Sequence, residues 1–414
     1  MDHPTPHAGA ALTRRSLLLG TAAAGTALAM PHVARAAEPI RIGLLQAKQG
    51  PIVQQAEYLQ QGTMLALAQM NNTLLGRPAE ILWEDEPTPQ AAAQNAERLI
   101  RERRVVALLG GTLSSTALAE EAVAGQLRIP YMCNNAAARE ITGRNCNRYS
   151  FRLQPPVPVH ARAMLPYLTG IGKRWYFLTA SYAFGQDIAR SFKELLREVG
   201  GTEAGADEVP VGTADYSAFV LKIRAAKPDL VIGGITSGDL SNFLKQWNEL
   251  GMRDAVPFTE ISVGDTDLWA IGRETACGTY TKTWYYRDPN NSADDREFAA
   301  AYQAKYKRPA ADKAWMGWYS ARAMFRAIEA AQSTEPDAIV AALENWRESD
   351  AGMTVDFRKW DHQMVHRLLV AGVKQQIPDQ WDYFDVLASV PKTEAAMQQA
   401  YGGEADTACH MPPT

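Results

Sequence analysis

The chain has 414 residues, of which 46% are hydrophobic and 21% are charged, so it is long and apolar enough to form two or more well-packed domains. Its formal net charge is -4, and no basic tract follows the N-terminal segment. This charge argues against nucleic acid or an anionic membrane surface as a partner.

Residues 1–36 have the pattern of an export signal. Arg14 and Arg15 precede the apolar stretch SLLLGTAAAGTALAM, and the small residues Ala34 and Ala36 are spaced as in a signal-peptidase site. The apolar stretch is about 15 residues long and a membrane-spanning helix needs roughly 20, so we expect cleavage after Ala36 and no stable membrane insertion. The arginine pair is typical of a twin-arginine signal. We therefore expect a periplasmic bacterial protein exported by a cleavable signal.

Strand-like and helix-like segments alternate after the signal. IRIGLL (40–45) predicts a buried strand, and the apolar spacing of YLQQGTMLALAQMN (58–71) predicts a helix. Further segments of alternating type lie at 79–85, 89–102, 105–111, 115–126 and 129–134. Repeated strand-helix-strand units imply a parallel sheet with helices on its faces. They predict a first lobe over residues 37–154.

Three prolines, Pro155, Pro156 and Pro158, follow and predict a break in regular structure. The alternation resumes with the strand-like RWYFLTA at 174–180. Further helix-like and strand-like segments lie at 185–200, 207–211, 216–226, 228–234, 238–251 and 256–261. They predict a second lobe over residues 155–280.

The remaining chain is too short for a third lobe. We expect residues 281–352, which contain two helix-like segments, to complete the first lobe. Residues 353–390 are expected to return to the second lobe, and residues 391–414 to form a C-terminal tail. The predicted fold class is therefore α/β, with two Rossmann-like lobes whose parallel sheets are flanked by helices.

Four cysteines lie in a chain that we expect in an oxidising compartment: Cys133, Cys146, Cys277 and Cys409. None forms a Cys-x-x-Cys pair, and no histidine stands beside them at zinc spacing, so we predict no metal site. Sequence alone leaves three ways to pair four cysteines. Cys409 would benefit most from a disulfide, because free chain ends fray.

The segment GGTLSSTA (110–117) follows a predicted strand, at the sheet edge where parallel sheets bind ligands. Gly110 and Gly111 allow close approach of the backbone, and a helix beginning near Ser114 would offer N–H groups and hydroxyls to an anion. Alternatively, Ser114 or Ser115 caps that helix.

No catalytic or cofactor motif accompanies this segment. It lacks the second glycine of the nucleophile elbow GxSxG, and neither a P-loop nor GxGxxG follows a predicted strand. We therefore predict that the chain is not an enzyme, needs no cofactor, and binds a small molecule without reacting with it.

Other ionisable clusters are predicted to lie at the surface. His362 and His366 stand in the extended-looking HQMVHRLLVAGV, where a rise of about 3.3 Å per residue separates them by roughly 13 Å. Two acidic pairs on predicted helices are expected to form solvated faces, Glu120-Glu121 and Asp294-Asp295.

Taken together, the segments resemble the periplasmic type I solute-binding proteins of ABC importers, of the leucine/isoleucine/valine-binding kind. The resemblance covers nearly the whole mature chain. It is carried by the order and spacing of GRPAEILWEDEPTPQAAAQNAERLI, VVALLGGTLSSTALA, IPYMCNNAAAREIT, NRYSFRL, SYAFGQD, KPDLVIGG and NFLKQWNELG. The late RKWDHQMVHRLLVAGV and the terminal ACHMP look like the branched-chain amino acid or aromatic-compound branch.

The resemblance implies a mechanism and partners. A small-molecule ligand would be trapped between the lobes by hinge closure, and a membrane permease would recognise the closed form. We expect a monomer. The expected crossings between the lobes are Pro155 to Pro158, the segment near Gly278 and the chain near Met353. The resemblance also favours Cys146 as the disulfide partner of Cys409.

The resemblance implies ligand contacts, residue by residue. Ser114 matches the serine whose hydroxyl contacts the ligand carboxylate. Asn135 and Ala137 match positions that offer backbone groups to the same carboxylate, although the family often has threonine at the latter. Phe184 matches the aromatic residue that closes over the ligand, usually a tyrosine, and Tyr182 would supply the missing hydroxyl.

Three further residues complete the expected site. Gln46 and Gly234 lie at its rim, and Glu260 is the expected acceptor for a ligand ammonium. The family carboxylate follows the strand matched by VPFTEIS, so Glu260 is shifted toward the strand and Ser262 stands nearer the motif position. The resemblance favours an amino acid, branched-chain or other, as the ligand, and the shift of Glu260 keeps a carboxylate ligand without an ammonium as a competitor.

Other functions stay open at this point. The ligand would lack an ammonium if it were an aromatic or aliphatic acid or an amide, and the aromatic run Trp284 to Tyr286 would then line the pocket or simply pack in the core. A periplasmic ligand sensor is a further alternative. A secreted hydrolase is another, because fold does not determine function.

Overall fold

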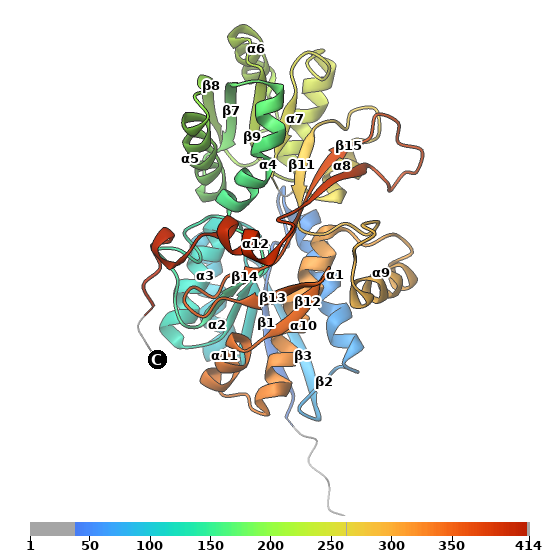
Figure 1. Cartoon of the computed structure of the whole chain (residues 1–414). Helices are drawn as coiled ribbons and strands as arrows, with labels where there is room; N and C mark the ends of the chain where they lie inside the picture. The colour runs from blue at the N-terminus through green and yellow to red at the C-terminus, as the bar shows by residue number, and fades with distance from the viewer. Residues whose placement is uncertain (1–37, 262, 412–414) are drawn as a thin grey trace, which may run out of the picture. The chain divides into compact units, whose positions relative to one another are not determined.

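Two β-sheets flanked by helices organise the chain, and the computed structural model describes residues 38–261 and 263–411 (Figure 1). The predicted signal peptide and Ser262 therefore lie outside the described residues. The chain from Pro39 onward forms one compact unit. In the described part, no helix combines the length and the apolar character that a membrane span requires.

The first sheet has six strands in the order β2-β3-β1-β4-β5-β6, parallel except for β2. The strands are β1 (Ile40–Leu45), β2 (Thr73–Leu74), β3 (Arg77–Glu84), β4 (Ala107–Gly110), β5 (Tyr131–Cys133) and β6 (Ser150–Arg152). Its helices are α1 (Val53–Gln69), α2 (Pro89–Arg101), α3 (Ser114–Leu127), α9 (Ala293–Tyr306), α10 (Asp312–Ala331) and α11 (Pro336–Glu344). Residues of α1 and α10 share one hydrophobic core and those of α2 and α3 share another, which explains why β1 is apolar on both faces.

The second sheet has seven strands in the order β16-β15-β11-β10-β9-β7-β8, and β15 is antiparallel to both of its neighbours while the other pairs are parallel. Its strands are β7 (Arg174–Ala180), β8 (Thr202–Val209), β9 (Leu230–Gly234), β10 (Phe258–Glu260), β11 (Thr279–Lys282), β15 (Leu368–Val373) and β16 (Phe384–Val390). Its helices are α4 (Val157–Ile171), α5 (Ala183–Glu198), α6 (Ser217–Ala226), α7 (Gly238–Glu249) and α8 (Asp265–Ile271). The predicted α/β class with two Rossmann-like lobes is confirmed.

Helices α1 and α10 approach each other unusually closely. A Cβ atom on Gly62 would lie 1.9 Å from the Ala314 carbonyl oxygen, and one on Gly317 would lie 1.9 Å from that of Leu59. Only glycine fits at such backbone contacts. Residues that follow the second-lobe segment in sequence therefore complete the first sheet's core.

Within the described residues, the chain crosses between the two sheets three times. The first crossing, residues 153–156, lies where the prolines predict it. The second is 283–292, between β11 and α9, and the third is 366–367, between β14 and β15. The expected crossings near Gly278 and Met353 are therefore corrected, because Gly278 directly precedes β11 and Met353 begins a strand of a third sheet.

The third sheet is small and lies beside the first. It joins β12 (Arg347–Asp350), β13 (Met353–Phe357) and β14 (Met364–Val365), and Gln363 bridges to Arg152 at the end of β6. The break expected at Pro158 is also wrong, since α4 begins at Val157. Proline is tolerated in a first helical turn, where backbone N–H groups have no helical partner.

The two histidines are buried, so their predicted surface position is wrong. His362 is 1% exposed and His366 is 4% exposed. The His362 ring stacks on Phe151 with centroids 3.9 Å apart, and the His366 Nε2 lies 3.0 Å from the Leu153 carbonyl oxygen. Their extended segment runs along the edge of β6, which buries them.

Three of the four acidic residues expected on solvated faces are also buried: Glu120, Glu121 and Asp295. Asp295 accepts the Trp315 indole N–H at 2.6 Å, and its backbone N–H donates to Ser292, the residue that caps α9. Asp294 is exposed as predicted. Asp295 lies in the first turn of α9, where acidic side chains accept hydrogen bonds from backbone N–H groups. The pattern of charges in the sequence does not indicate such contacts.

Cys146 and Cys409 form a disulfide, the pair that the family resemblance implies, while Cys133 and Cys277 are free thiols. The last helix, α12 (Glu394–Tyr401), packs on α4 and β14. Figure 1 shows this C-terminal segment, in red, near the junction of the two sheets. The disulfide ties it to the first sheet's side.

Candidate ligand site between the two sheets

Loops at the carboxyl ends of both sheets line a cavity of about 30 Å³. Five of the residues predicted from the sequence line it: Ser114, Asn135, Ala137, Tyr182 and Phe184. Seven other residues line it as well: Gln55, Thr112, Leu113, Ala136, Gln154, Thr236 and Lys313. The cavity lies where parallel sheets place ligands.

On the first sheet's side, the cavity wall is made of neutral donors and acceptors. Ser114 is the first residue of α3, and Leu113 holds the cap position, so neither Ser114 nor Ser115 caps the helix. The Ser114 hydroxyl instead accepts the Ala138 backbone N–H at 3.2 Å. The Asn135 amide donates to the Thr112 carbonyl oxygen at 2.7 Å. These bonds fix the two loops against each other.

Two buried glutamates lie beneath this wall. The Glu86 carboxyl accepts the Thr112 backbone N–H at 2.9 Å and the Thr116 hydroxyl at 2.6 Å. Glu120 accepts the Tyr131 hydroxyl at 2.9 Å. Burial raises the pKa of both carboxyls, and the charge of Glu86 raises the pKa of Glu120 further. Burial and their mutual proximity therefore favour a protonated form of the pair.

On the second sheet's side, aromatic rings meet a polar bridge. The Tyr182 and Phe184 rings stack with centroids 6.3 Å apart at the start of α5. The Gln55 side-chain amide, on α1, donates to the Thr236 hydroxyl at 2.9 Å and to the Asp267 carboxylate at 3.2 Å. Gln55 thus connects the two sides across the cavity, although nothing in the sequence pattern distinguishes it from other helical glutamines.

A charged cluster lies behind this bridge. Lys282, on β11, is completely buried, and its Nζ lies 3.1 Å from an Asp265 carboxylate oxygen and 3.7 Å from one of Asp312. The backbone N–H groups of Asp265 and Asp312 donate to each other's carboxylates at 3.2 and 2.9 Å. Burial raises the pKa of Asp265 to about 6, although Lys282 opposes this shift. Burial raises the pKa of Asp267 to about 6 as well, and Lys313 opposes it.

Glu260 is buried at the end of β10 and does not line the small cavity. Burial raises its pKa well above the usual range, and the nearby Asp267 raises it further. The Ile235 backbone N–H and the charge of Lys313 oppose this shift. Its Oε2 has no hydrogen-bond partner among the described residues. This oxygen is therefore available to accept a hydrogen bond from a cation.

The two expected rim residues also lie outside the cavity lining. Gln46 is buried in the loop after β1, where its carbonyl oxygen accepts the Trp83 indole N–H at 3.0 Å. Gly234 packs so closely on Thr179 that a Cβ atom would lie 2.7 Å from that side chain. The structure therefore places both residues in the surrounding scaffold.

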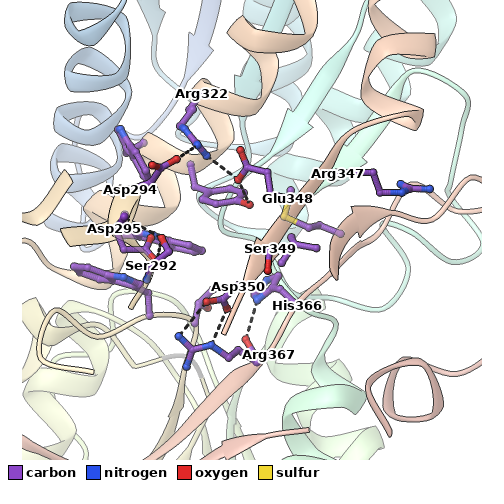
Figure 2. Close-up of a pocket in the computed structure, with 18 of the residues that line it drawn as sticks. Ser292, Asp294, Asp295, Arg322, Arg347, Glu348, Ser349, Asp350, His366 and Arg367 are labelled. Carbon is purple, nitrogen blue, oxygen red and sulfur yellow. Dashed lines mark hydrogen bonds and ion pairs between the residues drawn. The ribbon is translucent and has the colours of Figure 1, made fainter. Parts of the chain in front are cut away.

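A larger cavity of about 470 Å³ lies near α9, α10 and β12 (Figure 2). Trp284 lines it, whereas the Tyr285 hydroxyl donates to Asp382 at 2.6 Å. The arginines of this cavity already have carboxylate partners: Arg322 bonds to Glu348 at 2.8 Å and Arg367 to Asp350 at 2.7 Å (Figure 2). Little unbalanced charge is left there for a ligand.

Ion pairs connect the two sides beyond the small cavity. The Arg139 Nε donates to the Asp187 carboxylate at 2.6 Å, and its Nη2 donates to the Ser191 hydroxyl at 2.6 Å. The Arg190 Nη2 lies 2.6 Å from a Glu140 carboxylate oxygen. Arg139 and Glu140 follow β5, and the other three residues lie on α5. Together they hold the loops of the first sheet against a helix of the second.

The chain matches a family model described as periplasmic binding protein over residues 39–377. A curated relative, Leu/Ile/Val-binding protein homolog 8 of Brucella suis, is 27% identical over 351 residues, which cover 80% of this chain and 86% of the relative. A solved periplasmic binding protein from Burkholderia mallei is similar with a TM-score of 0.81 and 26% identity, covering 90% of this chain and 99% of that one.

A second solved structure is similar in fold alone. It is a solute-binding protein of an ABC transporter from Rhodopseudomonas palustris in complex with 3,4-dihydroxybenzoic acid, with a TM-score of 0.77, 20% identity, and coverage of 85% of this chain and 97% of that one. The matched family and these relatives are named as binding proteins, which agrees with the prediction that the chain is not an enzyme.

Proposed function

The chain belongs to the periplasmic binding protein family, and we propose that it is the solute-binding component of an ABC importer that captures an amino acid between its two sheets. The observation that carries this proposal is the cavity in which Ser114 and Ala137 from one side meet Phe184 from the other. Hinge closure at the three crossings would trap the ligand, and a membrane permease would receive it.

The distribution of polar groups around the cavity supports a ligand with two opposite charges. The first sheet's wall offers a hydroxyl and backbone groups suited to a carboxylate. The buried carboxyls of Glu260 and Asp267 lie behind the cavity wall on the second sheet's side. Each has an oxygen without a hydrogen-bond partner among the described residues. A ligand ammonium would donate to the Glu260 oxygen that has no hydrogen-bond partner among the described residues, and the ion pair would compensate the burial of the ammonium.

An aromatic acid is the second candidate. The stacked rings of Tyr182 and Phe184 suit a flat apolar ligand. Burial raises the pKa of Glu260 and favours its neutral form, which suits a ligand that lacks an ammonium. The solved relative with 3,4-dihydroxybenzoic acid shows that this fold accommodates such an acid elsewhere.

Matched pairs of ligands distinguish the two candidates. Isothermal titration would compare leucine with 4-methylpentanoate, and phenylalanine with 3-phenylpropanoate, since the members of each pair differ only in the ammonium. We expect the amino acids to bind more tightly by about tenfold or more, the equivalent of roughly 1.4 kcal/mol. Tighter binding of the acids, or of 3,4-dihydroxybenzoate, would favour the second candidate instead.

Ser114→Ala tests the site itself. If the hydroxyl donates to a ligand carboxylate, its loss should weaken binding by about 1.5–3 kcal/mol, roughly ten- to hundredfold. Ser115→Ala is the matched control, because the neighbouring hydroxyl does not line the cavity. Urea unfolding of both variants separates loss of affinity from loss of the Ala138 hydrogen bond. Equal affinities for the two variants would remove Ser114 from the site.

We further propose that residues 1–36 are a cleavable twin-arginine signal that delivers the folded protein to the periplasm. Replacement of Arg14 and Arg15 by lysine should leave precursor in the cytoplasm, as measured by cell fractionation. Normal export of the double variant would exclude the twin-arginine route and leave the periplasmic assignment of the family untouched.

A further inference from the structure

A cavity of about 860 Å³ lies beside the first crossing, on the side covered by the C-terminal segment. Its walls come from residues 139–144, from α4 and from the chain between residues 399 and 408, which the Cys146–Cys409 disulfide ties down. It shares no lining residue with the 30 Å³ cavity. Its chemistry is therefore separate from that of the proposed ligand site.

Arginines outnumber carboxylates on its walls. The lining carboxylates are Glu140, Glu194, Asp361 and Asp406. The lining arginines are Arg139, Arg144, Arg152, Arg162, Arg190 and Arg358. Three of these arginines, Arg139, Arg190 and Arg358, have close carboxylate partners. The other three, together with Asp406, which forms no ion pair with a described residue, determine the charge that the cavity presents to a ligand.

Arg152 is the buried member of these three. It is 0% exposed, and its partners are all neutral: Gln363 Oε1 and the Ala138 carbonyl oxygen, each at 2.6 Å, and the Thr142 hydroxyl. A guanidinium has five N–H groups, so three hydrogen bonds to the described residues leave two without a partner there. A buried charge without an opposite charge is costly.

The acidic groups nearest to Arg152 do not provide that opposite charge directly. Asp361 is held by Arg358, and no carboxylate of the described residues lies within ion-pair distance of Arg152. Glu121 is buried, and its pKa is well above the usual range, because desolvation outweighs the opposing charge of Arg152. Burial therefore favours its neutral form.

Arg144 and Arg162 line the same cavity from opposite sides. Arg144 lies in the loop after β5, its side chain is 69% exposed, and it reaches Glu140 only at 3.7 Å. Arg162 lies on α4, is exposed, and makes no hydrogen bond or ion pair with a described residue. Both guanidinium groups are free to turn toward a bound molecule.

We propose that this cavity binds a small oxyanion, of the carboxylate, sulfate or phosphate type, between Arg144, Arg152 and Arg162. Guanidinium groups present paired N–H donors that match the oxygens of such anions. The anion neutralises the buried charge of Arg152 and accepts its two remaining N–H groups. The site does not depend on the function proposed above.

The test is isothermal titration of the mature protein with inorganic phosphate, sulfate and acetate, at an ionic strength held constant with chloride. We expect saturable binding of at least one of these anions. The double variant Arg144→Ala/Arg162→Ala should weaken it by about tenfold or more, since two charge-assisted contacts are lost. Both side chains are exposed, so their removal leaves the fold intact, which would not be assured for a change at Arg152.

Two controls make the result specific. Arg103→Ala/Arg197→Ala removes the same charge from exposed positions outside the cavity and should leave anion affinity unchanged. Ser114→Ala should also leave it unchanged, because Ser114 belongs to the other cavity. No saturable binding, an equal loss in the control double variant, or a loss in Ser114→Ala would overturn the proposal.

Discussion

Beneath the Gly110–Thr112 loop, Glu86 and Glu120 are buried beside each other with no cation among their described partners, whereas Asp265 and Asp312 share the buried ammonium of Lys282. In the first cluster burial favours the protonated form, and two hydroxyls and a backbone N–H donate to the carboxyl oxygens. In the second, Lys282 and Lys313 lie beside the two carboxylates and compensate their charges. The stability of the first cluster therefore depends on pH. The stability of the second depends on the presence of each charged partner.

The largest expected effect is at the second cluster. Lys282→Met should reduce the free energy of unfolding by about 3–5 kcal/mol, because the buried Asp265 carboxylate loses its cation and Asp312 keeps only Lys313 at 3.8 Å. Lys222→Met is the control, since the Lys222 side chain is 58% exposed and its ion pair with Asp207 should contribute less than about 1 kcal/mol. Urea unfolding measures both variants. Similar losses would mean that burial does not distinguish the two pairs.

The next effect is a pH dependence at the first cluster. The folded-state pKa of Glu120 lies well above its usual 4.5, so above pH 4.5 the unfolded chain releases a proton that the folded chain keeps. Wild-type stability should then fall with rising pH by up to about 1.4 kcal/mol per unit, until the folded-state pKa is reached. Glu120→Gln removes this term and can still accept the Tyr131 hydroxyl.

The measurement is urea unfolding of wild type and Glu120→Gln between pH 5 and pH 8. The variant should gain stability relative to wild type as the pH rises, and the two should converge near pH 4.5. Glu97→Gln, on the exposed face of α2, should show no such trend. A constant difference across this range would mean that Glu120 is ionised in the folded protein.

The smallest expected effect comes from a neutral partner. Tyr131→Phe removes the hydroxyl that donates to Glu120 at 2.9 Å and should cost about 1 kcal/mol at pH 5. Tyr131→Phe should cost a similar amount in the Glu120→Gln background, because the amide oxygen there still accepts the hydroxyl. A cost as large as that of Lys282→Met would contradict the view that this cluster is held by neutral hydrogen bonds.

The sequence predicts the fold well and the site in part. Apolar runs such as IRIGLL and the alternation of segments predict both sheets, because parallel strands are buried on both faces. Ser114, Asn135, Ala137, Tyr182 and Phe184 line the cavity as the family resemblance implies, although their contact with a ligand stays a prediction.

Other parts of the site leave no signal in the sequence. Gln55 and Lys282 contact residues that are distant in the sequence. A glutamine on a helix or a lysine on a strand has no local sequence pattern that predicts such a contact. The predicted surface position of Glu120 is wrong, because the charge pattern indicates an exposed helix face. Its burial depends on Tyr131 from the next strand. Long-range contacts of single side chains are what spacing rules omit.

The glycine contact between α1 and α10 affects how mutations can alter ligand preference. Gln55 and Lys313 line the cavity, and each lies on one of the two helices that Gly62 and Gly317 bring into backbone contact. The two helices therefore behave as one rigid frame that sets the spacing of these side chains. A single methyl group at either glycine would push the frame apart. Ligand preference can thus drift through substitutions that never touch the ligand.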